Sequence, residues 1–480
     1  MIASGVGVVH SPSATVAMIF GTLVVIGLSL RPTAAVYLTI LLAATTLPEV
    51  VPTTFRLAGF SFRAYEPFLV VSAIYVLVRY KSSRSANIKV CFLVFLFLAW
   101  SILGLSFGNP PLKIVADVRL PIYMAIAYAI GLRIAGTDLS HRVLSTFRIS
   151  LWFSAGITLL SSTTGLPING READSTLNLQ GTGDEAIRLL SAATYPSLAV
   201  LCSVIALAIA GRASLWSTIS FGAPALFIVV VSFSRNSILG IGVAAIYAII
   251  AARKTRAMTR ALSIASGILT AAIAVVIAEP LLRATSGGSW LVQQIEAFQG
   301  RVLGGLTTDG LATDGSAQFR FEQEDFYLLP KIWDSPLIGH GFGYAYKPLF
   351  TGRIVASDDF QYYAHNFYLW LLVKTGIIGL AIFVFALVLP LFHAQRHLGA
   401  QSLATGAAAV GLLACSFVAP MPLGSPTSVL LGVLAGICAA AAPGVSTRAP
   451  EMISPTLEVD VEWRNKRLPL HAHTTRQGDH

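Results

Sequence analysis

The sequence predicts an all-α integral membrane protein with about twelve to thirteen transmembrane helices and one large extracytoplasmic loop. The 480-residue chain is 55% hydrophobic and only 12% charged, whereas soluble domains carry roughly 25% charged residues. Apolar runs of the roughly 20 residues needed to cross a bilayer recur along the chain. The runs are continuous rather than alternating, which favours helices over a barrel, and a helix satisfies its own backbone in lipid.

Thirteen apolar runs qualify as candidate spans. They cover approximately 14–30, 33–48, 66–80, 88–107, 112–135, 143–162, 195–211, 214–233, 236–252, 260–278, 366–392, 402–420 and 424–442. The first two could instead form a re-entrant pair, which would leave twelve. The N-terminus shows neither a basic region nor an obvious cleavage site, so we expect the first run to be retained.

Basic residues in short loops predict the orientation, because such loops are enriched in Lys and Arg on the cytoplasmic side. Three alternating loops carry these clusters, with Arg79, Lys81, Arg84 and Lys89, then Arg133, Arg142 and Arg148, then Arg253, Lys254, Arg256 and Arg260. The opposite face then holds loops 48–65, 107–113, 162–194, 234–236 and 279–365. This placement accounts for much of the net charge of +10 without invoking nucleic acid.

Four regions follow from this topology. They are an N-terminal transmembrane bundle (1–278), a large extracytoplasmic loop with short helices (279–365), C-terminal transmembrane helices (366–442) and a disordered cytoplasmic tail (443–480). Within the loop, apolar residues at helical spacing predict an amphipathic helix over 290–302. We expect a second short helix over 318–333 and a glycine-rich turn over 336–343.

Two residues are the leading candidates for chemistry. Arg235, in S-F-S-R-N-S, lies on the face where short-loop basic residues are rare. It either extends to lipid head groups or binds an anion with its planar guanidinium. His365 opens the eleventh span, where it is either a polar residue at a helix start or a general base for a sugar hydroxyl.

Other charged residues have a structural and a functional interpretation. Arg320 could pair with Glu324 four residues later or bind phosphate, and Arg171 and Arg188 leave the same choice between an ion pair and an anion site. Asp117 and Arg119 lie about one turn inside the outer face, where charges are costly and often functional, and Arg119 is a further candidate for binding the substrate. They are two residues apart and therefore do not face each other.

We predict no metal site and no cofactor. Gly339, Gly341 and Gly343 are not followed by the Lys-Ser/Thr of a P-loop, so a tight turn is expected and a backbone anion nest is the alternative. The pair Asp358-Asp359 has no further carboxylates at hard-metal spacing. His340 and His365 lie on different elements, which gives little support for zinc.

Residues 365–380, H-N-F-Y-L-W-L-L-V-K-T-G-I-I-G-L, resemble the signature of the O-antigen ligase and polysaccharide polymerase superfamily. The preceding S-P-L-I-G-H-G-F-G, with Arg320 upstream, is similar to the family's loop motif, and S-F-S-R-N-S is similar to its serine-arginine turn. Two departures stand out. The family usually has glutamate where this chain has Lys374. An aromatic residue commonly follows the family's loop arginine, and here only Phe326 offers an approximate match.

The resemblance implies a fold similar to membrane-embedded, lipid-sugar-dependent (GT-C-like) glycosyltransferases. Such an enzyme transfers a glycan from undecaprenyl pyrophosphate to an acceptor hydroxyl at the outer face of the bacterial cytoplasmic membrane. His365 would be the base, and Arg235 and Arg320 would hold the pyrophosphate, in a metal-independent, inverting displacement. The implied partners are membrane lipids, the lipid-linked donor, a glycan or lipid-glycan acceptor, and flippase and chain-length regulator proteins.

Two alternatives come from other classes of protein. A transporter or flippase of lipid-linked saccharides predicts charged residues buried in mid-span and broken helices. A structural membrane protein would not need a histidine beside several outward arginines. Because the charged candidates gather at one face and in one loop, the pattern favours an enzyme, with ligase and polymerase both left open.

Overall fold

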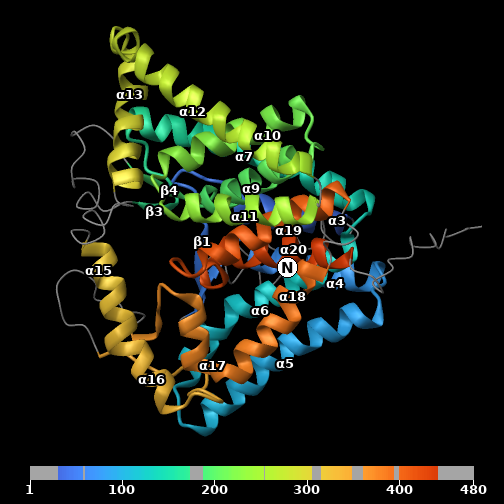
Figure 1. Cartoon of the computed structure of the whole chain (residues 1–480). Helices are drawn as coiled ribbons and strands as arrows, with labels where there is room; N and C mark the ends of the chain where they lie inside the picture. Colours follow the sequence, from blue (N-terminus) through green and yellow to red (C-terminus); the bar gives the residue numbers. More distant parts are fainter. Residues whose placement is uncertain are drawn as a thin grey trace, which may run out of the picture. The chain divides into compact units, whose positions relative to one another are not determined.

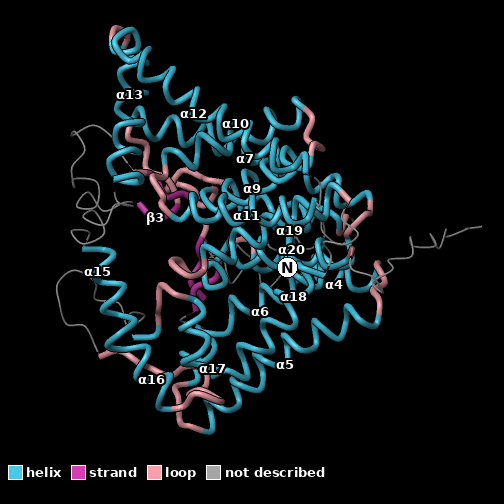
Figure 2. Tube along the Cα trace, viewed as in Figure 1, coloured by secondary structure: helices cyan, strands magenta, loops and turns pink. Residues whose placement is uncertain are grey.

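The computed structural model contains mostly helices, with a few short strands (Figures 1 and 2). It describes residues 31–57, 60–172, 188–252, 255–304, 315–348, 361–393 and 399–441. The expected first span and the expected tail lie outside these residues.

Twelve of the expected spans coincide with helices of the structure. These are α3 (Thr33–Ala44), α4 (Glu66–Arg79), α5 (Arg84–Ser106), α6 (Pro111–Ile134), α7 (Asp138–Thr164), α9 (Thr194–Ala210), α10 (Leu215–Val231), α11 (Asn236–Ala252), α12 (Thr255–Arg283), α17 (Phe367–Phe383), α19 (Ala400–Cys415) and α20 (Ser425–Ala440). The α17 helix continues through a π-helical turn, η5 (Val384–Val388), into α18 (Leu389–His393). Within the described residues, α5, α6, α7, α12 and the α17–α18 run are long and apolar enough to cross a membrane. The predicted all-α membrane architecture is therefore confirmed.

The large loop contains helices at both of the expected places. The first is α13 (Ser286–Phe298), extended by η1 (Gln299–Leu303), and the second runs through α15 (Gly315–Glu322), η3 (Gln323–Leu328) and α16 (Leu329–Asp334). A single 3₁₀ turn, η7 (Met421–Leu423), precedes α20.

Two short antiparallel hairpins were not predicted. Strands β1 (Thr54–Leu57) and β2 (Phe60–Arg63) form one, and β3 (Gly170–Glu172) and β4 (Leu189–Ser191) form the other. Each strand has three or four residues, too few for an alternating apolar pattern to be recognised in the sequence.

Helices α6 and α20 pack closely in the centre of the fold because glycine lines their interface. A Cβ atom added at Gly436 would lie 2.3 Å from the Tyr128 carbonyl oxygen, and one added at Gly432 would lie 2.3 Å from that of Met124. Gly131 of α6 is equally close to the Val433 oxygen. Small residues four apart let membrane helices approach in this way, and van der Waals contact then holds them together.

We therefore expect Gly436→Ala to lower the stability of the protein by about 1–3 kcal/mol, the usual cost of overpacking. Gly242→Ala is the matched control, because a Cβ atom there meets nothing within 4 Å. Thermal unfolding of the detergent-solubilised variants, followed by tryptophan fluorescence, measures the difference. Equal unfolding temperatures for the two variants would contradict the close packing.

Hydrogen bonds join the five loops that the charge pattern assigned to one face. The bonds run from Glu49 N to Pro167 O (3.0 Å), Arg188 Nε to Ser232 O beside the 234–236 turn (3.0 Å), Arg235 Nε to Arg301 O (2.9 Å) and Asn109 Nδ2 to His340 O (3.0 Å). At the opposite helix ends, Arg133 donates to Asn87 Oδ1 at 2.8 Å. The loops with the candidate site residues therefore gather at one end of the helices.

Candidate functional site

His365 lies immediately before the N-cap of α17. The Asn366 side chain accepts hydrogen bonds from the backbone N–H groups of Tyr368 (3.1 Å) and Leu369 (3.3 Å). Asparagine is among the preferred N-cap residues because its oxygen satisfies these otherwise unpaired donors. The Phe367 N–H donates to the Ser416 carbonyl at the end of α19 (2.9 Å). The α17 start, and with it His365, is thus held at a defined place.

The neighbours of the His365 imidazole include an amide and two aromatic rings. Its Nδ1 lies 2.9 Å from Gln323 Oε1. The Tyr363 and Phe319 rings meet it edge-on, with ring centroids 5.1 and 6.2 Å away. Sequence reasoning missed Gln323. The available signal was its spacing, because it follows Arg320 by three residues and therefore shares a helix face with it.

Arg320 lies in the last turn of α15 and is partly exposed. Glu324 lies on the following turn, near Arg320 and Asn366. Burial raises the pKa of Glu324, while Asn366 and Arg320 oppose that shift. The α15–η3 segment thus faces the start of α17 and brings Arg320 to the neighbourhood of His365.

Arg235 lies in the tight turn between α10 and α11. Phe233 in this turn has φ of 43°, a conformation costly for a bulky residue and retained only where the surroundings enforce it. The buried Phe233 side chain packs against Ala297 and Val302. The Arg235 Nε donates to the Arg301 carbonyl at 2.9 Å. The large loop therefore covers the turn and orients Arg235.

Arg188 reaches the same turn, since its Nε donates to the Ser232 carbonyl at 3.0 Å. Tyr195 of α9 lies near Asn236, Arg188 and Tyr363. The Tyr363 ring in turn contacts the His365 imidazole.

The structure places the other two predicted arginines differently. Arg171 lies in β3 opposite Leu190 of β4, and its side chain lies outside the described residues. Arg119 forms an ion pair with Glu66 at 3.5 Å, and Glu66 also accepts a hydrogen bond from Tyr123 at 2.8 Å. Arg119 thereby links α6 to α4.

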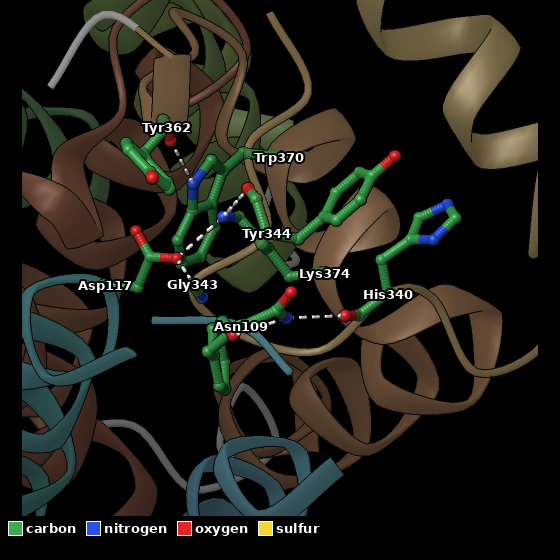
Figure 3. Close-up of polar contacts among 9 residues, drawn as sticks. Asn109, Asp117, His340, Gly343, Tyr344, Tyr362, Trp370 and Lys374 are labelled. Atoms are coloured by element: carbon green, nitrogen blue, oxygen red, sulfur yellow. Dashed lines mark hydrogen bonds and ion pairs between the residues drawn. The ribbon is translucent and has the colours of Figure 1, made fainter. Parts of the chain in front are cut away.

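Lys374 and Asp117 form a buried ion pair (Figure 3). Lys374 Nζ lies 2.6 Å from Asp117 Oδ2, and the side chains are 0% and 8% exposed. Lys374 also donates to the Tyr344 carbonyl (2.7 Å), and Asp117 Oδ2 accepts from the Gly343 N–H (2.7 Å). The pair ties α6 and α17 to the glycine-rich turn. Asp117 and Arg119 thus have separate partners, as their spacing requires.

A cage of aromatic rings surrounds the Lys374 ammonium. Its Nζ lies 5.4 Å from the ring centroids of Tyr346 and Tyr362, and 5.9 Å from that of Trp370. The negative faces of such rings stabilise a cation. The lysine at this family position is therefore accommodated by specific partners.

The segment 336–341 forms hydrogen bonds with the backbone of α17 where that helix is broken. Gly376, with φ of 61° and ψ of −170°, interrupts the helix, which frees backbone groups that lipid could not satisfy. The segment supplies partners through Ile377 N to Pro336 O (2.9 Å), Ile378 N to Leu337 O (3.2 Å), His340 N to Val373 O (3.0 Å) and Gly341 N to Lys374 O (2.9 Å).

The three glycines of the turn permit this close approach. Gly339, Gly341 and Gly343 all have positive φ, which glycine adopts without steric cost. A Cβ atom at Gly339 would lie 2.5 Å from the Lys374 backbone, and one at Gly341 would lie 2.4 Å from Gly104. The tight turn expected from the sequence is present, and its amides bind protein groups.

Lys347 is a second buried lysine, which sequence reasoning did not single out. It is 4% exposed. Its ammonium donates to the Tyr363 carbonyl and lies 5.6 Å from the centroid of the Tyr346 ring. Burial lowers the pKa of Lys347 to about 7. A group whose charge changes near neutral pH therefore adjoins the residue that contacts His365.

The residues considered above as metal ligands do not form a cluster in the described part of the chain. His340 Nε2 lies 2.9 Å from the Lys331 carbonyl, and its ring stacks on Tyr344 with centroids 4.2 Å apart. Asp358 and Asp359 lie outside the described residues. Within the part of the chain that is described, no group of three His, Cys, Asp or Glu side chains is close enough to hold a metal ion.

Comparison with known families supports the sequence resemblance. Residues 220–384 match the family model described as O-antigen ligase. The match contains Arg235, Arg320, His365 and the 336–343 turn, and Arg119, Arg171 and Arg188 lie outside it. No curated protein matches the chain. Residues 220–384 of this membrane chain are therefore similar to the O-antigen ligase family.

Proposed function

We propose that the protein transfers a glycan from a polyprenyl-pyrophosphate donor to an acceptor hydroxyl at the outer face of the bacterial cytoplasmic membrane. The observation that supports this proposal is the Gln323–His365 contact, which joins the helical segment of Arg320 to the start of α17. The hydrogen bonds of Arg188 and Arg235 at the turn between α10 and α11 add to it. A base beside several guanidinium groups suits a displacement with an anionic leaving group.

The step exchanges one bond at the anomeric carbon and transfers one proton. The acceptor oxygen attacks the anomeric carbon, and the bond from that carbon to the pyrophosphate oxygen breaks. The hydroxyl proton passes to His365, and the electron pair leaves with the polyprenyl pyrophosphate. Arg235, Arg320 and Arg188 stabilise the charge that grows on the leaving group, where preorganised donors contribute most. A single displacement of this kind inverts the anomeric configuration.

The transporter alternative predicts a broken helix and charges buried within a span, and both are present. Gly376 breaks α17, and Lys374 and Asp117 are buried beside the break. The 336–341 segment satisfies the four backbone groups named above, however, and the two charges neutralise each other. This arrangement favours a structural role for the break over a transport site.

Purified protein in liposomes tests the proposal, using a lipid-linked glycan donor with either a second donor molecule or a lipid-glycan as acceptor. We expect glycan transfer with release of polyprenyl pyrophosphate, and equal rates with and without EDTA. The preferred acceptor distinguishes polymerase from ligase. Movement of the donor between leaflets without release would favour the transporter, and strict dependence on added divalent cations would reject the metal-independent route.

A further inference from the structure

Gln323 makes three contacts that together determine its amide orientation. Its Oε1 accepts from the His365 backbone N–H at 3.3 Å and lies 2.9 Å from His365 Nδ1. Its Nε2 donates to the Tyr363 carbonyl at 3.4 Å. The His365 backbone N–H can only donate and the Tyr363 carbonyl can only accept. If the amide were reversed, its NH₂ would face the His365 N–H and its oxygen would face the Tyr363 carbonyl, and neither pair can form a hydrogen bond. The Oε1 atom therefore faces the imidazole.

We infer that Gln323 is a positioning residue that keeps the His365 proton on Nδ1 and the lone pair on Nε2. An amide oxygen is an acceptor only, so the Nδ1 beside it must be the donor of the neutral ring. The Nε2 atom is then the one that can take a proton. This inference rests on the proposed role of His365 as the base.

The surroundings of Gln323 keep this contact in place. Gln323 is 2% exposed and begins the π-helical turn η3, a distortion often found at functional sites. The Lys347 ammonium donates to the same Tyr363 carbonyl, which keeps that oxygen an acceptor. When Nε2 gains the acceptor's proton, Nδ1–H still donates to Gln323. The imidazolium ion therefore forms without rearrangement of its neighbours.

Nitrogen-15 NMR of the histidine-labelled wild-type protein tests the tautomer directly, at a pH where the ring is neutral. The His365 signal is identified by its loss in His365→Gln. We expect Nδ1 to carry the proton in the wild type, and the Nε2–H form to gain population in Gln323→Met, which has similar length and only a weakly accepting thioether in place of the amide oxygen. A wild-type His365 with its proton on Nε2 would overturn the inference, whatever the activity.

Kinetics separate positioning from general damage. Gln323→Met should lower kcat by about tenfold to a hundredfold, within the roughly 10²–10⁴ that a general base contributes, with KM for the donor unchanged. Gln323→Glu restores an acceptor and should recover kcat. Its carboxylate favours the charged imidazolium, so the acidic limb of its pH–rate profile should move to higher pH. Unchanged kcat in Gln323→Met, or no recovery in Gln323→Glu, would contradict the role.

The pH profile is compared between variants because other titratable and charged groups surround the ring. These are Arg320 and Glu324 on α15–η3, Lys347 and Tyr363 on the loop, and Arg188 and Tyr195 near α9. Failure of the proposed function has a separate signature. Glycan transfer by His365→Ala would reject the base, while the tautomer measurement would still report on the Gln323 contact.

Discussion

Replacing His365 by alanine should reduce glycan transfer by about 10²–10⁴-fold, the range for loss of a general base. The acceptor hydroxyl then has no group positioned to take its proton. His365 precedes the N-cap, and the contacts of Asn366 with Tyr368 and Leu369 and of Phe367 with Ser416 do not use its side chain. We therefore expect the variant to remain folded, with transfer measured in the liposome assay.

His393→Ala is the matched control for this variant. His393 is exposed at the end of α18, and its Nδ1 lies 2.9 Å from the Leu389 carbonyl of the same helix. Its replacement should leave the transfer rate unchanged. Equal activity of His365→Ala and the wild type would reject His365 as the base.

Replacing Lys374 by methionine should destabilise the protein by about 3–5 kcal/mol, the cost of leaving the remaining member of a buried ion pair without its counter-charge. Asp117 would lose its counter-charge in a site where it is 8% exposed, and the Tyr344 carbonyl would lose its donor. The apparent unfolding temperature in detergent, together with the monodispersity of the purified protein, measures the effect.

The double variant Lys374→Met/Asp117→Asn distinguishes the charge effect from lost packing. It removes both charges and keeps a side-chain oxygen for the Gly343 N–H, so it should be more stable than Lys374→Met alone. Lys331→Met provides an exposed control, since its partner Asp334 is at the surface, and it should leave the unfolding temperature unchanged. A double variant no more stable than the single one would contradict the ion-pair explanation.

Several elements of the candidate site could be predicted from local sequence. The H-N pair before an apolar run marked the start of α17, because asparagine is a favoured N-cap. The serine-arginine turn stood out because an arginine on that face breaks the charge bias of short loops. Glycines without a following Lys-Ser/Thr indicated a turn, and the structure has one at Gly339.

Other contacts had no local signal. Gln323 and His365 are 42 residues apart, and although Gln323 shares a helix face with Arg320, the sequence near it does not indicate His365 as its partner. Lys347 looks like an ordinary loop lysine, since its burial depends on how the loop packs. Lys374 was recognised as an unusual residue for its family, but its partner Asp117 is 257 positions away.

By itself, the sequence determined the helical membrane architecture, the grouping of the loops by face and the identity of the His365 and Arg235 candidates. Each depends on patterns within about twenty residues, because bilayer thickness, helix caps and loop charge act locally. Only the tertiary structure decided which buried charges pair, how the 336–341 segment bonds to the broken backbone of α17, and which residue contacts His365 Nδ1. These depend on buried polar groups finding partners across distant segments, and burial makes that pairing obligatory.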